Sequence, residues 1–227
     1  MSLLIRKVSF VLTLVSVLYL FSDKTTAQDD YFVLADFKSL QESYFRLGDS
    51  LLKAEIGSFT FIGSILGVQP HAGLREFEIQ YLSHDSLLLF LDDYRIYITA
   101  SRFRTFEHQL GFIPGENYLR YIDGNIFWGY SGRVPHRKIG AVFIDTGNEY
   151  IELPYHSYAD LFEPNLCRKR RFLIFNERIH CHTRAFLSAD NNRLYIHMSN
   201  NRKPLKYEVT WIIRNGRYAG RVVDYAH

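Results

Sequence analysis

The sequence predicts a mainly β protein, an antiparallel sandwich or partly closed barrel with one N-terminal helix and a C-terminal meander. Three observations predict this fold class. Aromatic residues make up 16% of the 227 residues, with Tyr 16 and Phe 18, and they favour strands. Apolar and polar residues alternate with a period of two in segments repeated roughly every ten residues. Turn dipeptides such as Asp123-Gly124 and Asn215-Gly216 separate the segments.

The first 27 residues have the composition of a secretory signal peptide. Arg6 and Lys7 precede the apolar stretch 8–21, and Ala27 ends a polar segment of small residues. The alternative is an uncleaved anchor helix, but the apolar run is shorter than the roughly 20 residues that a membrane span needs. We therefore expect an exported, periplasmic or secreted protein with no transmembrane anchor after cleavage, whose single domain is residues 28–227.

The next segment, 36–55, is the one predicted helix, because Leu40, Tyr44 and Leu51 belong to an apolar series with steps of three and four. Asp36 would cap this helix at its start. The strand patterns that follow cover 58–66, 76–82, 87–91, 94–100, 103–113, 118–122, 126–128, 139–145 and 150–153, and then 171–175, 179–183, 194–198, 207–213 and 217–223 in the meander.

The weakest join in this series is 154–166, where Pro154 and Pro164 bracket a short helical turn at 157–162. It is either a crossover loop within one domain or the boundary between two lobes. Because the segment lacks the composition of a flexible linker, we expect one domain.

Two cysteines, Cys167 and Cys181, are expected to pair, because an exported chain meets an oxidising compartment. The resulting loop of about 15 residues would stabilise the fold by ~3 kcal/mol in the chain-entropy model. One disulfide in a domain of this length supports a hydrophobic core and does not replace it.

Charge is concentrated beside the first cysteine. Residues 28–227 carry 24 basic and 23 acidic side chains, so the formal charge of +3 falls to +1 and a nucleic-acid partner is not expected. Arg168, Lys169, Arg170 and Arg171 form a local positive patch for an acidic protein face, an anionic glycan or a lipid head group. The alternative is a solvated loop inside the disulfide ring.

Asp145-Thr146-Gly147 resembles the catalytic turn of aspartic proteases. Catalysis of that kind needs two carboxylates that share one proton, and therefore a second motif in the chain or a symmetric dimer; the chain has no second Asp-Thr-Gly or Asp-Ser-Gly. Asn148 also stands where those enzymes have Ser or Thr. The alternative is a hairpin turn between two strands, which accounts for the Asp, Gly and Asn by turn chemistry alone.

Two further clusters are candidate sites. His180 and His182 would share one strand face and, with His197, could bind zinc; otherwise they are exposed histidines beside a disulfide. Trp128 and Tyr130 belong to an aromatic group near glycines that could stack on sugars or contact a protein partner; otherwise these rings pack in the core. The remaining members of that group are Tyr118, Tyr121 and Phe127.

The stretch 155–167, with Ala159-Asp160-Leu161-Phe162, and the tail 207–224, with Asn215-Gly216-Arg217-Tyr218, resemble segments of small exported bacterial β-rich proteins of unassigned function. The resemblance covers the last third of the chain. It implies an exported β-rich domain and no particular activity.

No nucleophile elbow, phosphate-binding loop or dinucleotide fingerprint occurs in the sequence. We therefore expect a non-enzymatic protein-binding domain, similar to an inhibitor or an immunity protein, which uses an aromatic and basic surface and needs no cofactor. The alternatives are a carbohydrate-binding module at Trp128 and a hydrolase, either aspartic at Asp145 or zinc-dependent at His180 and His182.

Overall fold

A computed structural model describes residues 42–129, 132–172, 176–200 and 206–225, all of which belong to one compact unit. The predicted signal peptide, Asp36 and Tyr130 lie outside these residues. Within the described ranges, no helix is long and apolar enough to cross a membrane.

The helical elements are few and short: η1 (Tyr44–Arg46), α3 (Ser50–Gly57), α4 (Phe61–Ile65), η2 (Thr105–Glu107) and η3 (Tyr155–Ser157). The first strands are β1 (Leu74–Glu76), β2 (Glu78–Leu82), β3 (Ser86–Leu91), β4 (Tyr94–Arg102), β5 (Leu110–Phe112), β6 (Leu119–Ile122), β7 (Arg137–Asp145) and β8 (Tyr150–Glu152). The later strands are β9 (Cys167–Phe172), β10 (Asn176–Cys181), β11 (Thr183–Ser188), β12 (Arg193–Asn200), β13 (Tyr207–Arg214) and β14 (Arg217–Tyr225).

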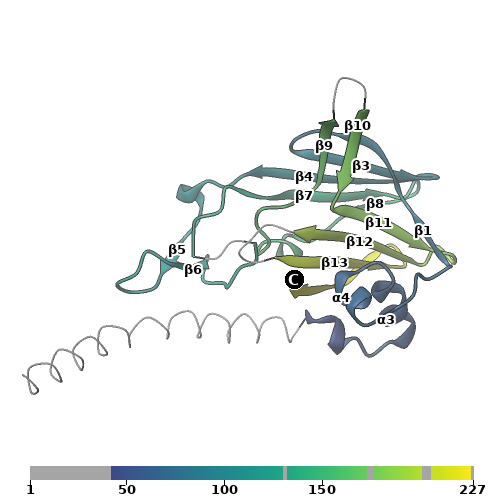
Figure 1. Ribbon diagram of the computed structural model, residues 1–227, viewed down its shortest axis with the longest axis horizontal. Coiled ribbons are helices and arrows are strands. Elements are labelled where there is room, and N and C mark those ends of the chain that lie inside the picture. Colours follow the sequence, from purple (N-terminus) through teal and green to yellow (C-terminus); the bar gives the residue numbers. More distant parts are fainter. Residues whose placement is uncertain (1–41, 130–131, 173–175, 201–205, 226–227) are drawn as a thin grey trace, which may run out of the picture. The chain divides into compact units, whose positions relative to one another are not determined.

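Two five-stranded antiparallel sheets form the body of the molecule (Figure 1). One has the order β1-β11-β12-β13-β14 and the other the order β2-β3-β4-β7-β8. The chain passes from the first sheet to the second at Phe77, a buried residue between β1 and β2. The predicted class, mainly β with antiparallel pairing, is therefore confirmed as a sandwich, and the sheets do not close into a barrel.

The main core lies between the two sheets, because their inner faces contribute to one apolar cluster. Its fully buried members include Leu87, Ile96, Ile98, Val142 and Ile144 from one sheet and Ala185, Ile196, Val209 and Trp211 from the other. The join 154–166 contributes Leu161 and Leu166 to the same cluster, so this crossover packs between the sheets.

A second apolar cluster lies on the outer face of the β1-β11-β12-β13-β14 sheet. Tyr44, Leu52 and Ile56 pack there on Phe186 and Tyr195. We call residues 43–66, which contain η1, α3 and α4, the helical layer.

The predicted single helix over 36–55 is wrong in its described part. The chain leaves the helical conformation around Gly48, and α3 begins afresh at Asp49, whose carboxylate accepts the amides of Leu51 (3.0 Å) and Leu52 (3.1 Å). The predicted strand 58–66 is also wrong, since α4 lies there and is capped by the Thr60 hydroxyl.

Smaller corrections concern the middle of the chain. The predicted strand 126–128 is only an isolated bridge between Trp128 and Leu161, and 103–113 contains η2 before the short strand β5. The helical turn expected at 157–162 lies earlier, at η3. The expected strand 179–183 is divided, because β10 ends at Cys181 and β11 begins at Thr183.

Candidate binding surfaces

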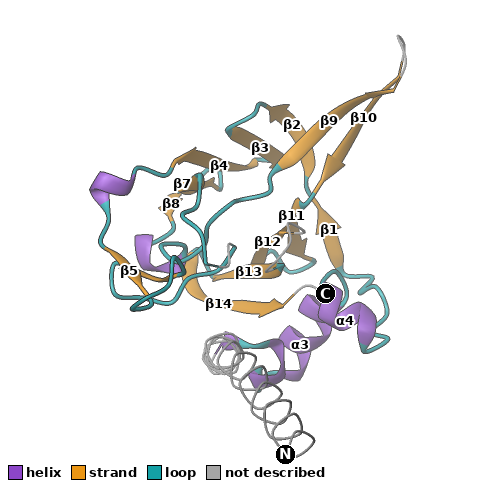
Figure 2. Cartoon of the chain, turned by 60° about the vertical axis from the view of Figure 1, so that its left-hand side comes forward, coloured by secondary structure: helices purple, strands orange, loops and turns teal. Residues whose placement is uncertain are grey.

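The first candidate surface is the hairpin of β9 and β10, which we call the basic hairpin. It forms a two-stranded sheet of its own and projects from the sandwich (Figure 2). Cys167 and Cys181 face each other across its base and form the predicted disulfide. The run Arg168–Arg171 lies in strand β9 and not in a loop. Arg168 is opposite His180, and Arg170 is opposite Arg178.

The second candidate surface is the outer face of the β2-β3-β4-β7-β8 sheet, which we call the tyrosine face. Its residues form two neighbouring rows across the strands. The first row is Tyr81, Leu88, Tyr97, Phe143 and Glu152, and the second is Glu78, Phe90, Arg95, Asp145 and Tyr150. Tyr81, Tyr97 and Tyr150 are 55%, 45% and 68% exposed. Large exposed rings gathered on one face are typical of a contact surface.

Sequence reasoning missed the tyrosine face, although part of the signal is present. Tyr97 lies between Ile96 and Ile98, so the period of two alone directs it away from the core. Its neighbours could not be inferred, because β4 pairs with β7 across an intervening hairpin of β5 and β6.

Asp145 lies at the end of β7, where the chain turns into β8. Its carboxylate accepts the amide of Gly147 (2.8 Å), and the Thr146 hydroxyl accepts the amide of Glu149 (3.0 Å). These contacts are those of a hairpin turn. Among the described residues, Asp145 has no contact with a second carboxylate, which the protease hypothesis requires.

The three histidines of the zinc hypothesis do not converge. His180 is exposed in β10, His182 lies in the break between β10 and β11, and His197 is buried in β12. The break removes the shared strand face on which the hypothesis depended. Within the described ranges, no group of three or more His, Cys, Asp or Glu side chains is placed to hold a metal ion.

Trp128 is 3% exposed and packs against the rings of Tyr207 (6.2 Å) and Tyr225 (5.0 Å). Phe127 is equally buried in a small cluster with Phe162. Of the rings expected to form a surface, Trp128 and Phe127 are therefore buried, whereas Tyr118 and Tyr121 are half-buried.

An aspartate–histidine pair at the base of the β5–β6 hairpin was also not predicted from the sequence. His108 stacks on Phe103, and its Nδ1 lies 2.6 Å from Asp123. Its Nε2 lies 3.1 Å from Lys138 Nζ in β7. Burial alone would raise the pKa of Asp123, but its hydrogen bonds to His108 and to the amide of Gln109 lower it. Because both ring nitrogens are engaged, the pair fixes the hairpin on β7 and offers no free nitrogen to a substrate.

Two buried carboxylates hold the helical layer on its sheet. Glu208 in β13 accepts the amides of Phe61 (2.7 Å) and Ile62 (3.0 Å) at the start of α4. Asp224, its register partner in β14, accepts the Ser43 hydroxyl (2.6 Å) and the Tyr44 amide (2.9 Å). The side chains of both lie on the face that sequence patterning treats as exposed, because the layer that covers them comes from the opposite end of the chain.

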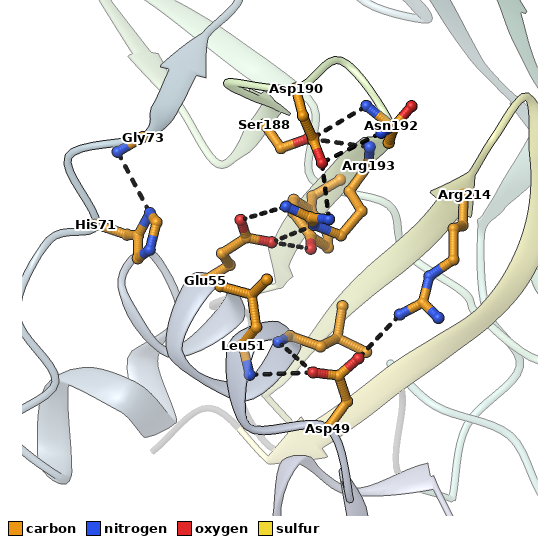
Figure 3. A network of polar contacts seen from close by, with 12 residues as sticks. Asp49, Leu51, Glu55, His71, Gly73, Ser188, Asp190, Asn192, Arg193 and Arg214 are labelled. Atoms are coloured by element: carbon orange, nitrogen blue, oxygen red, sulfur yellow. Dashed lines mark hydrogen bonds and ion pairs between the residues drawn. The ribbon is translucent and has the colours of Figure 1, made fainter.

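A polar network adds a third attachment of this layer (Figure 3). Glu55 of α3 accepts two hydrogen bonds from Arg193, from Nε (2.8 Å) and Nη2 (3.1 Å), and one from the Tyr195 hydroxyl. Asp49, the cap of α3, also pairs with Arg214 (3.2 Å).

The buried carboxylates make stability depend on pH. Desolvation raises the pKa of Glu208 to about 7, more than the amides of Ile62 and Phe61 lower it, and nearby Asp224 raises it further. The folded state therefore holds this proton more tightly than the unfolded state. The stabilisation is fully present below the unfolded pKa of about 4.5 and is lost as the pH rises through 7.

The quantity to compare is the free energy of unfolding of the native chain minus that of Glu208→Gln. We expect this difference to fall by about 1–3 kcal/mol from pH 5 to pH 8. Urea denaturation of both proteins at the two pH values measures it. His197, whose Nε2 lies 3.8 Å from Glu208 and whose pKa burial lowers to about 3, contributes with the opposite sign in both proteins. A difference that does not change between pH 5 and pH 8 would contradict the expectation.

Comparisons with family models, with curated proteins and with solved structures give no significant match for this chain. Functional inference therefore depends on the two surfaces described above.

Proposed function

We propose that this chain is an exported, non-enzymatic protein-binding domain, of the inhibitor or immunity type, which contacts an acidic partner through the basic hairpin. The single observation that carries the proposal is the hairpin itself: a projecting, separate sheet closed at its base by a disulfide and rich in cations.

The distribution of charge supports an acidic partner. The hairpin has five basic residues, in Arg168–Arg171 and Arg178, against one acidic residue, Glu177. The remainder of residues 28–227 has 19 basic and 22 acidic residues, so the positive charge is concentrated in the basic hairpin. Such asymmetry steers an oppositely charged partner to one part of the surface.

The disulfide supports the proposal in two ways. It restricts the free basic hairpin, so that less conformational entropy is lost on binding and the affinity is higher. It also fits an oxidising compartment, in agreement with the signal-peptide composition of residues 1–27.

The test is affinity capture from a periplasmic or secreted extract, followed by titration of the captured, purified protein against this chain. We expect a partner that is retained by the native chain and lost when Arg168–Arg171 are changed to Ser. Its Kd should weaken as salt is raised, because exposed charges are screened.

A matched control removes cations elsewhere. Arg102, Arg104, Arg133 and Arg217 are exposed, and replacement of these four by Ser should leave the affinity unchanged. Equal loss of binding in the control, or a partner that binds the Arg168–Arg171 variant as tightly as the native chain, would overturn the role of the hairpin.

A further inference from the structure

We propose that the tyrosine face is a separate binding site and that its ligand is an extended, uncharged, β-linked glycan. This site lies on the sheet, and the proposal does not depend on the function assigned to the basic hairpin.

The arrangement of the rings suits a long, flat ligand. Tyr81 and Tyr97 lie in the same row on strands separated by β3, so about 10 Å separates their backbones at the usual strand spacing. Leu88 lies between them in the row, and its apolar side chain is buried. Further along, Phe143 follows in the row and stacks on Tyr150, with their ring centres 5.5 Å apart. The three exposed tyrosines, Tyr81, Tyr97 and Tyr150, therefore lie on strands two places apart in the sheet, a backbone separation of about 10 Å that is comparable with two hexose units of an extended chain.

The charges of the face complement an uncharged ligand at its centre. Arg95 is the register partner of Asp145, so opposite charges face each other across neighbouring strands. Glu78 and Glu152 lie on the two edge strands, about 19 Å apart at the usual spacing, too far to act together on one cation. Between them the exposed surface consists mainly of aromatic and aliphatic groups.

Each part of a sugar ring finds a partner on such a surface. The axial C–H groups of a hexose carry a partial positive charge and pack on the negative face of an aromatic ring. Its hydroxyl groups point outward from the ring and can donate to the carboxylates of Glu78, Asp145 or Glu152. A polyanionic glycan would instead meet three carboxylates and one arginine.

The test is isothermal titration of the full chain with soluble β-1,4-linked hexasaccharides of glucose and of mannose, and with an α-linked glucose hexasaccharide for comparison. We expect binding of at least one β-linked probe and weaker binding of the α-linked one. Tyr97→Ala should weaken the affinity about tenfold or more, as loss of a central aromatic contact does. Tyr150→Ala should weaken it as well and serves if Tyr97→Ala does not fold.

Two controls separate this site from others. Tyr155→Ala removes a ring that is 56% exposed in η3, away from the face, and should leave glycan affinity unchanged. The Arg168–Arg171 to Ser variant should also bind glycan normally, so failure of the hairpin proposal and failure of this one are distinguishable. Absence of binding to both β-linked probes, or equal losses in Tyr97→Ala and Tyr155→Ala, would overturn the proposal. Capture of a cationic protein by the tyrosine face in place of glycan would do the same.

Discussion

Replacement of Arg221 by Met is expected to lower the free energy of unfolding by about 3–5 kcal/mol, because it leaves two partly buried carboxylates, Asp160 and Glu42, without their cation. The Arg221 side chain is 6% exposed and donates to both carboxylate oxygens of Asp160, at 2.6 and 2.9 Å. It also donates to the Ser157 carbonyl (2.9 Å) and to Glu42. One side chain in β14 thus joins Glu42, the residue just before the helical layer, to the crossover at Ser157 and Asp160.

Equilibrium urea denaturation of the native chain and Arg221→Met measures this loss. Arg217→Met is the matched control, since Arg217 is exposed in the same strand and should change stability by no more than about 0.5 kcal/mol. Similar small losses in the two variants would show that the Arg221 contacts contribute little to the fold.

The second large effect is expected at Glu55. Glu55→Ala should lower the free energy of unfolding by about 3–5 kcal/mol, because Arg193 loses two hydrogen bonds and the buried Tyr195 hydroxyl loses its acceptor. The network in Figure 3 shows why the effect is not local: the carboxylate comes from α3, and its partners come from β12.

A double-mutant cycle resolves the pair. Glu55→Met and Arg193→Met should each be costly alone, whereas the two combined should lose clearly less than the sum of these single losses, because no charge is then left buried. Glu116→Ala, at an exposed loop position, should leave stability nearly unchanged. Additive single losses would contradict a direct coupling between Glu55 and Arg193.

The strands were the most predictable part of the fold. The alternation in 94–100 and 207–213 and the turn at Asn215-Gly216 are local signals, and β4, β13 and β14 follow them closely. The hairpin at Asp145 also obeys turn chemistry within five residues, so the alternative to a catalytic turn could be weighed from the sequence itself.

The helical layer could not be predicted, because its boundaries depend on distant residues. Asp224 binds Ser43 and Tyr44, at the start of η1, across about 180 positions of sequence, within the range of the predicted helix. Glu208 binds the first amides of α4 from about 147 positions away and stabilises a helix where alternation predicted a strand. Tertiary contacts of this kind override local propensity.

The two candidate surfaces also differ in how far the sequence alone could predict them. Four cations of the basic hairpin, Arg168–Arg171, are adjacent in sequence and were found there, whereas the tyrosine face is assembled from five strands whose order only the fold reveals. The prediction of an exposed Trp128 failed for two reasons. Alternation separates the two sides of a strand but does not say which side is covered, and the segment around Trp128 is not a strand.

The disulfide at the base of the basic hairpin has a consequence for strand pairing. A slip of one residue between β9 and β10 would exchange the two faces of the hairpin, and isolated two-stranded sheets have little else to prevent it. Cys167 and Cys181 are direct register partners, so their covalent bond is incompatible with a shifted alignment. Two sulfur atoms therefore determine which residues of β9 and β10 stand opposite one another, and reduction would release that alignment at the point where Cys167 meets the main core.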